Sequence, residues 1–221
     1  MAGLNLFDLM DITLRSLFVT LSATVLTAAV AMPLGALLAI SRFPRRRAVI
    51  ATLNAFMGIP PVVVGLLVYL ALSRSSPLGV LGLLFTPWAM ILAQSIILFP
   101  LITSLTHQAM RDLWSDYHDL LISLGAPKSQ RLRILLWDGR RALLTAGLAG
   151  FGRALGEVGA VMIVGGNIDH ATRVLTTAIQ LETSKGNLGF ALALGAVLIC
   201  LSLCVSFTIH GLSRTERAGR W

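Results

Sequence analysis

Arg153 and Glu157 have the clearest potential for chemistry in this sequence, because both lie inside a strongly apolar stretch, residues 143–164. Charged side chains in such a stretch are rare and costly, and they normally face a partner or a water-filled cavity. Their spacing of four predicts that they share one face of a helix and can form an ion pair. Two interpretations stay open. The pair is a structural salt bridge, or Arg153 offers positive potential to a passing anion or belongs to a gate.

Small residues surround this pair along the same stretch. Gly152 and Gly156 form the plainest small-residue pair, and they belong to a larger set: Gly147, Gly150, Gly152, Gly156 and Gly159. Small faces let helices approach closely in a lipid environment, so we expect helix packing here, including packing across a homodimer axis. The alternative is that the glycines let the helix bend as a gate moves.

The amino-acid composition indicates the environment in which these residues lie. Of 221 residues, 56% are hydrophobic and only 13% are charged, about half the charged fraction of an average soluble domain, roughly 25%. The mean hydropathy is +0.81. The chain therefore cannot cover a globule with a solvated surface, and we expect a membrane protein. The net charge of +8 then indicates orientation in a membrane rather than nucleic-acid binding.

Five stretches are long and apolar enough to cross a bilayer, which takes about 20 residues each. Prolines interrupt several of them, which is tolerated in lipid where neighbouring helices satisfy the freed carbonyl groups. We therefore predict an all-α bundle of about five transmembrane helices in one domain, residues 1–221. The predicted spans are residues 17–40, 49–72, 81–105, 143–164 and 188–209.

Basic residues alternate between the connections, as five crossings require. Residues 41–47, the long connection 106–141 and the tail after residue 209 are rich in Arg and Lys, whereas the other connections hold few. Since basic residues gather in cytoplasmic loops, the N-terminus is expected outside and the C-terminus in the cytoplasm.

The long connection 106–141 is patterned rather than linker-like. Residues 106–124 read as an amphipathic helix, and Gly125 followed by Ala126 and Pro127 should stop it. A second short amphipathic helix over 128–137 completes a compact cytoplasmic projection. On physical grounds alone, an interfacial helix pair resting on acidic lipid is an alternative.

Several motifs resemble the permease subunits of binding-protein-dependent ABC importers. Residues 119–125 align with the first half of the cytoplasmic EAA motif of that family, with Asp119 in place of Glu, while the later Leu-Pro ending is missing. Residues 150–160 and 165–168 resemble the molybdate/tungstate branch, as do residues 57–65 in the second span. Residues 172–179 and 182–186 are most similar to tungstate permeases.

The resemblance implies the ABC importer permease fold, a prokaryotic inner-membrane location and import of tungstate or molybdate. In this family the EAA segment is a coupling helix that docks on a separate ATP-hydrolysing subunit. That assigns a docking role to the residues that match it: Asp119, Leu120, Leu121, Gly125 and Ala126. The implied partners are the ATPase subunit, an external substrate-binding protein, a second copy of the chain and membrane lipid, with no nucleic acid.

The expected transport path includes the outer connection 165–187, which we predict to be a re-entrant or surface helix near the external mouth. Its hydroxyl and backbone donors suit a tetrahedral dianion. The candidate path or gate residues are Arg153, Gly156, Glu157, Asn167, Thr176 and Thr177. Permeases for sulfate or another anion, and a stand-alone secondary transporter, remain alternatives.

No catalytic role is expected for this chain. Its four histidines are scattered without metal-ligand spacing, and it has neither a nucleophile elbow nor a phosphate-binding loop that ends in Lys-Ser or Lys-Thr. Cys200 and Cys204 lie in one apolar run, so a disulfide scaffold is not expected. We therefore predict no cofactor or metal here, with ATP-Mg bound by the partner subunit.

Overall fold

The computed structural model describes residues 6–41 and 43–218, with side chains described for 7–41 and 43–211. The described residues form nine α-helices and one 3-10 helix. These are α1 (Leu6–Ile40), α2 (Arg46–Phe56), α3 (Pro61–Leu72), η1 (Pro77–Leu81), α4 (Pro87–Ser123), α5 (Lys128–Asp138), α6 (Arg140–Leu155), α7 (Gly159–Gly165), α8 (Leu175–Ser184) and α9 (Leu188–Ala218).

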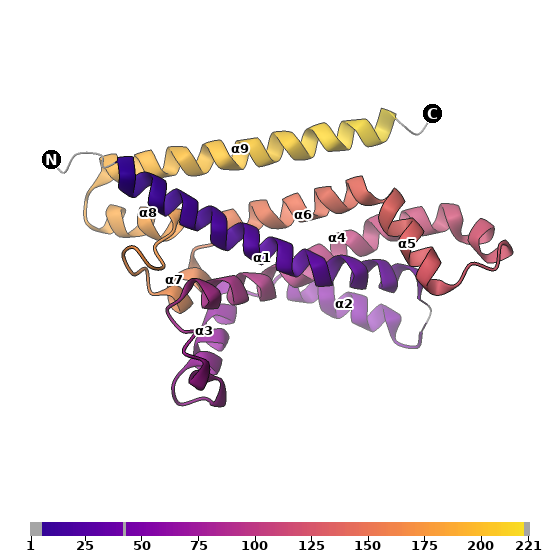
Figure 1. Cartoon of the computed structure of the whole chain (residues 1–221), viewed down its shortest axis with the longest axis horizontal. Helices are drawn as coiled ribbons and strands as arrows, with labels where there is room; N and C mark the ends of the chain where they lie inside the picture. Colours follow the sequence, from indigo (N-terminus) through magenta and orange to yellow (C-terminus); the bar gives the residue numbers. More distant parts are fainter. Residues whose placement is uncertain (1–5, 42, 219–221) are drawn as a thin grey trace.

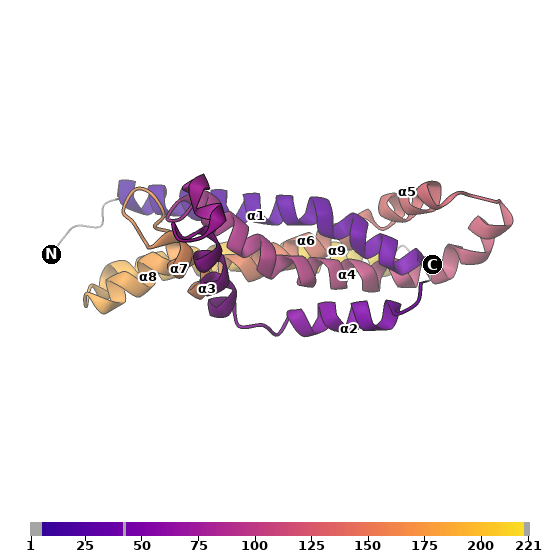
Figure 2. The same ribbon diagram turned by 90° about the horizontal axis from the view of Figure 1, so that it is seen from below.

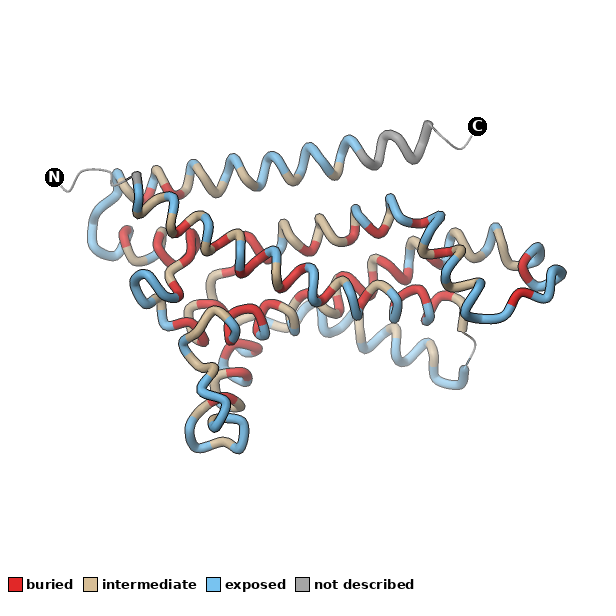
Figure 3. Tube along the Cα trace, in the orientation of Figure 1, coloured by how far each residue is buried: buried red, intermediate tan, exposed pale blue. Residues whose placement is uncertain are grey.

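Helices α1, α4 and α6 run along the long axis of the molecule, and α1 packs most extensively against α4 (Figures 1 and 2). Helix α1 begins and α9 ends at opposite ends of this axis. The main core lies between α1, α3, α4 and α7, with Met90 and Ile102 fully buried in it. By contrast, α2 and residues 188–211 of α9 are largely exposed in the single chain (Figure 3).

Within the described residues, three helices are long and apolar enough to cross a membrane: α1, α4 and α9. Two further crossings result if each of two bent helix pairs counts as one span. Helices α2 and α3 meet at 96°, and α6 and α7 meet at 64°. The predicted spans 49–72 and 143–164 are therefore broken helices, not continuous ones.

Two other boundaries differ from the sequence prediction. Residues 81–86 lie before α4, because the chain makes η1 and a turn before Pro87 starts the helix at its N1 position. At the other end, the predicted amphipathic helix 106–124 is not separate from the span. Helix α4 continues without a break to Ser123, so one 37-residue helix joins the membrane core to the predicted projection.

The distal halves of the two broken spans pack against each other, α3 against α7. The break before α3 follows from Pro60, which precedes a second proline and has extended backbone angles. Close approach of the two helices requires a small residue. A Cβ atom on Gly65 would lie only 2.7 Å from the Cα atom of Ala160.

Candidate functional site

The break between α6 and α7 is built around Glu157, which is buried with 8% of its surface exposed. Helix α6 ends at Leu155, and Gly156 follows as its C-cap. The carboxylate Oε1 of Glu157 accepts a hydrogen bond of 3.1 Å from the backbone N–H of Ala160. The carboxylate therefore satisfies a free donor in the first turn of α7, where a negative charge also interacts favourably with the helix dipole.

The predicted ion pair between Arg153 and Glu157 is absent from the described residues. The i, i+4 geometry requires a continuous helix, and the chain leaves the helix between these residues. Arg153 lies in the last turn of α6 with an exposed side chain that has no ion pair or hydrogen bond within the described part of the chain. The structural salt-bridge interpretation is therefore wrong, and an unpaired arginine remains on an apolar helix.

Thr176 and Thr177, at the start of α8, are both buried, at 6% and 0% exposed. The Thr176 hydroxyl donates to the backbone carbonyl of Glu157 at 2.8 Å. The Thr177 hydroxyl accepts from the backbone N–H of Val174 at 3.1 Å. Both hydroxyls thus hold α8 in place, whereas Gly156 is exposed beside Arg153 at the break.

Asn167 lies in the turn after α7, where Gly166 and Asn167 both have positive φ angles, 68° and 51°. Thr172 closes this turn, because its hydroxyl donates to the Gly165 carbonyl at 2.5 Å and accepts from the Ile168 N–H at 2.9 Å. The side-chain oxygen of Asn167 is buried without a hydrogen-bond partner among the described residues.

A charged cluster ties the start of α1 to the segment around α8. Asp11 contacts Arg15 at 2.9 Å and His170 at 3.4 Å, and Arg173 pairs with Asp169 at 2.7 Å. None of these residues was among the candidate site residues predicted from the sequence. The i, i+4 spacing of Asp169 and Arg173 was the available signal.

Glu182 is the buried carboxylate of this region, and it lies on α8. It accepts hydrogen bonds from Lys185 Nζ at 2.8 Å and from Asn187 Nδ2 at 2.9 Å. The hydrogen bond from Lys185 lowers the pKa of Glu182 most, although burial opposes this, and Asn187 and Arg173 lower it further. Glu182 is therefore held as a carboxylate.

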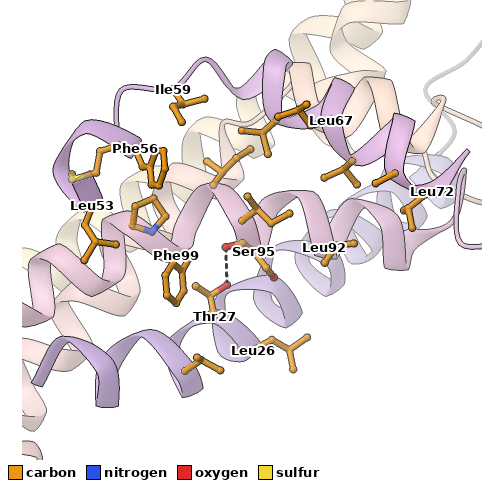
Figure 4. Close-up of a pocket in the computed structure, with 18 of the residues that line it drawn as sticks. Leu26, Thr27, Leu53, Phe56, Ile59, Leu67, Leu72, Leu92, Ser95 and Phe99 are labelled. Atoms are coloured by element: carbon orange, nitrogen blue, oxygen red, sulfur yellow. Dashed lines mark hydrogen bonds between the residues drawn. The ribbon is translucent and has the colours of Figure 1, made fainter. Parts of the chain in front are cut away.

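An apolar cleft of about 840 Å³ lies between α1, the α2–α3 pair and α4 (Figure 4). None of its lining residues is charged. The polar contacts that it shows are weak, since the Thr27 hydroxyl reaches the Ser95 carbonyl at 3.5 Å. This cleft suits an apolar surface, not a dianion. The apolar residues that line the cleft and are labelled in Figure 4 include Leu26, Leu53, Phe56, Ile59, Leu67 and Phe99.

The tip formed by α4 and α5 has the predicted helix–glycine–helix geometry (Figure 1). Gly125 has φ of 64°, its N–H bonds to the Ile122 carbonyl, and the Ala126 N–H bonds to the Leu121 carbonyl. This pair of bonds is the Schellman arrangement, for which a glycine in the left-handed region is favoured. Pro127 then precedes α5.

The tip exposes only part of the predicted docking set. Asp119, Leu120 and Gly125 are exposed, with Leu120 at 56%, whereas Leu121 and Ala126 are buried in the chain itself at 4% and 6%. Leu121 is thus not available as an apolar anchor in this conformation. Leu124, which is 70% exposed, offers an apolar side chain in its place.

The base of the tip packs into the rest of the chain. Met110 and Leu135 are fully buried in a cluster shared by α1, α4, α5 and α6. Arg46 reinforces it from α2, since its Nε donates to the Leu38 carbonyl at 2.8 Å near the end of α1. A displacement of the tip would therefore be transmitted to the start of α6.

Comparison with known proteins identifies the family. Residues 31–217 match the family described as "Binding-protein-dependent transport system inner membrane component". The chain belongs to this family. It is a permease subunit of an ABC transporter of the inner membrane, a class that works with an ATPase and a binding protein. Family membership excludes the stand-alone secondary transporter.

Relatives and a solved structure support the same assignment for this permease. It is 41% identical to a "Probable anion ABC transporter permease protein" of Haloferax volcanii, over 93% of this chain and 91% of the relative. It is 42% identical to the "Tungstate uptake system permease protein TupB" of Peptoclostridium acidaminophilum, over 89% and 86%. The fold matches a chain of the inward-facing MetNI methionine ABC transporter, with a TM-score of 0.75, 17% identity and coverage of 97% and 99%. The predicted ABC importer permease fold is confirmed.

Proposed function

We propose that this permease moves tungstate, with molybdate as the near alternative, into the cytoplasm by ATP-driven alternating access. Its similarity to a tungstate uptake permease and to a probable anion permease supports an oxyanion substrate. Sulfate is the alternative substrate, and oxyanion-stimulated ATPase activity distinguishes it from tungstate and molybdate. Tungstate and molybdate share size and charge, so discrimination between them would reside in the external binding protein.

The observation that carries this proposal is the unpaired Arg153 beside exposed Gly156 at the break between α6 and α7. Counting from Arg140, the arginine lies about 20 Å along α6 at 1.5 Å per residue. A cation at such a depth is costly against lipid and needs a partner or an aqueous cavity. A path for a dianion would supply that environment, and Arg153 would stabilise the ion as it passes or closes behind it.

No charged residue lines the apolar cleft between α1, α2–α3 and α4 of one chain, and we infer that two copies face each other around a shared path. The apolar side chains exposed along α3, such as Val63 and Leu67, and the apolar cleft beside them would pack against the second copy or against lipid. In this arrangement Arg153 from each copy would face the shared path.

The remaining parts follow from the same proposal. The external binding protein would deliver the ion at the end where α8 lies, with the N-terminus outside and the C-terminus in the cytoplasm. The α4–α5 tip, through Asp119, Leu120 and Gly125, would dock on an ATPase subunit that binds ATP-Mg. The permease chain would need no cofactor of its own.

ATPase activity in proteoliposomes that contain the permease, the ATPase subunit and the binding protein tests this function. Tungstate or molybdate should stimulate hydrolysis only when all three components are present. Stimulation by sulfate alone would overturn the substrate assignment. Purification of a functional permease without any ATPase subunit would overturn the coupling assignment.

A further inference from the structure

A second cavity lies between the turn after α7 and α8, two helices that lie together at one end of the molecule (Figures 1 and 2). Its volume is about 560 Å³, and it is lined by the turn after α7 and by one side of α8. The polar and charged residues that line it are Asn167, Arg173, Gln180, Ser184 and Lys185. Both charges are positive, and no carboxylate lines it.

The acidic partners of the two cations lie on the other side of the same segment. Asp169 and Glu182 line a separate cavity together with Asp8 and Asp11. Arg173 lines both cavities and so separates a negative side from a positive side. An anion that entered the second cavity would therefore meet Arg173 and Lys185 without facing these carboxylates directly.

Arg173 retains hydrogen-bonding capacity toward an anion. Its Nη1 bonds to Asp169 at 2.7 Å, but its Nε is buried without a partner within the described part of the chain. A guanidinium presents five N–H donors in a planar fork that matches oxyanions. Lys185 Nζ gives one contact to Glu182, and an ammonium group has three donors. Asn167 also lines the cavity, and its side-chain NH2 group can donate hydrogen bonds to an anion.

We propose that this cavity is a reception site for a tetrahedral oxyanion, with Arg173 as its main ligand and Lys185 and Asn167 as supporting ligands. The inference rests on the proposed import function. It adds a second anion-binding site, which the ion would reach before Arg153. The cavity is much larger than one small ion, so the ion keeps much of its water shell there. Binding is therefore weak and reversible, as a transit site requires.

Direct binding of tungstate to the permease–ATPase complex in lipid nanodiscs, without the binding protein, tests the site. Wild-type complex should bind tungstate saturably, and Arg173→Gln should weaken this binding roughly tenfold or more, since charge-assisted hydrogen bonds are the strong ones. Arg74→Gln removes the same charge from an exposed loop residue that does not line the cavity, and it should leave binding unchanged.

Asp169→Asn separates anion binding from a structural role. It removes the ion-pair partner of Arg173 but keeps the cation, so binding should be unchanged or tighter. Equal losses in Asp169→Asn and Arg173→Gln would mean that the pair only shapes the turn, and this would overturn the site. Absence of tungstate binding to wild type, or equal behaviour of Arg173→Gln and Arg74→Gln, would also overturn it.

Two further readouts keep the possibilities apart. If Arg173→Gln leaves tungstate binding intact but weakens association with the binding protein, the cavity is a protein-docking surface and the oxyanion site is wrong. If tungstate binds as predicted but no oxyanion stimulates ATPase activity in the full three-component system, the proposed function fails while the site stands. If oxyanions stimulate ATPase activity but tungstate does not bind the permease–ATPase complex directly, the proposed function stands and the site is wrong.

Discussion

The hydroxyl of Thr176 donates a hydrogen bond of 2.8 Å to the backbone carbonyl of Glu157, which joins α8 to the break between α6 and α7. The same Glu157 caps α7 through its carboxylate. The outer helix, the break and the unpaired Arg153 are therefore parts of one connected unit. A movement of α8 would reach the break next to Arg153 through this contact.

Replacing Thr176 by Val should destabilise the protein by about 1 kcal/mol, because a buried carbonyl loses its donor while the side-chain shape is kept. Thermal unfolding of the detergent-solubilised complex measures the change. Thr183→Val is the matched control, since Thr183 is exposed and its hydroxyl bonds only to Ile179 within α8. Equal effects of the two substitutions would mean that the link to Glu157 contributes nothing.

Replacing Gly65 by Ala should destabilise the protein by roughly 1–3 kcal/mol, because the added methyl group forces α3 away from Ala160. Gly195→Ala provides the control, since a Cβ there meets nothing within 4 Å in α9 and helix propensity improves. The midpoint of thermal unfolding should fall for the first variant and hold or rise for the second. A neutral Gly65→Ala would contradict the tight α3–α7 contact.

Replacing Leu120 by Ala should weaken association with the ATPase subunit without unfolding the permease, because this side chain is 56% exposed at the tip. Co-purification of the two subunits, and stimulated ATPase activity, would both decrease. Leu192→Ala is the control, as Leu192 is 74% exposed on α9, away from the tip. Full association of the Leu120 variant would show that the tip docks through other residues.

The lowered pKa of Glu182 predicts an acid-dependent loss of stability. A carboxylate whose pKa is lower in the folded state stabilises the fold at pH values above its ordinary pKa of 4.5. That contribution is lost as the pH falls below 4.5 and through the folded-state pKa. Unfolding followed as a function of pH should show this loss in wild type, and Glu182→Gln should reduce it. An unchanged acid profile in Glu182→Gln would contradict the assignment.

Replacing Arg153 by Gln should lower tungstate uptake roughly tenfold or more, because the passing dianion loses a charge-assisted contact at membrane depth. Arg153→Lys keeps the charge and should retain more uptake. Uptake is compared at equal amounts of assembled complex, with Arg74→Gln as the matched loss of an exposed charge. Unchanged tungstate uptake in the Arg153→Gln variant would contradict a role of Arg153 on the transport path.

Parts of this architecture could be predicted from local sequence because their causes are local. Gly125 needs only its left-handed backbone and the proline two residues later to end α4, and that turn is as predicted. The apolar stretches likewise matched helices or helix pairs. Pro60 and Pro61 signalled a bend in the second span, although the 96° angle depends on packing between α3 and α7.

The relationship of Arg153 to Glu157 could not be predicted, because its causes are distant in sequence. A spacing of four implies a shared helix face only while the helix continues. Here the Glu157 carbonyl bonds to Thr176, 19 residues later, and the carboxylate caps the next helix. The burial of Leu121 similarly depends on tertiary packing, which the amphipathic pattern did not separate from the exposure of Leu120.

Accumulation of tungstate inside proteoliposomes tests the central claim most directly, with the binding protein outside and ATP-Mg enclosed beside the ATPase subunit. The account predicts concentrative uptake that requires the permease, the ATPase subunit, the binding protein and ATP together. Uptake that persists without ATP or without the ATPase subunit, or uptake of sulfate but not of tungstate or molybdate, would contradict it.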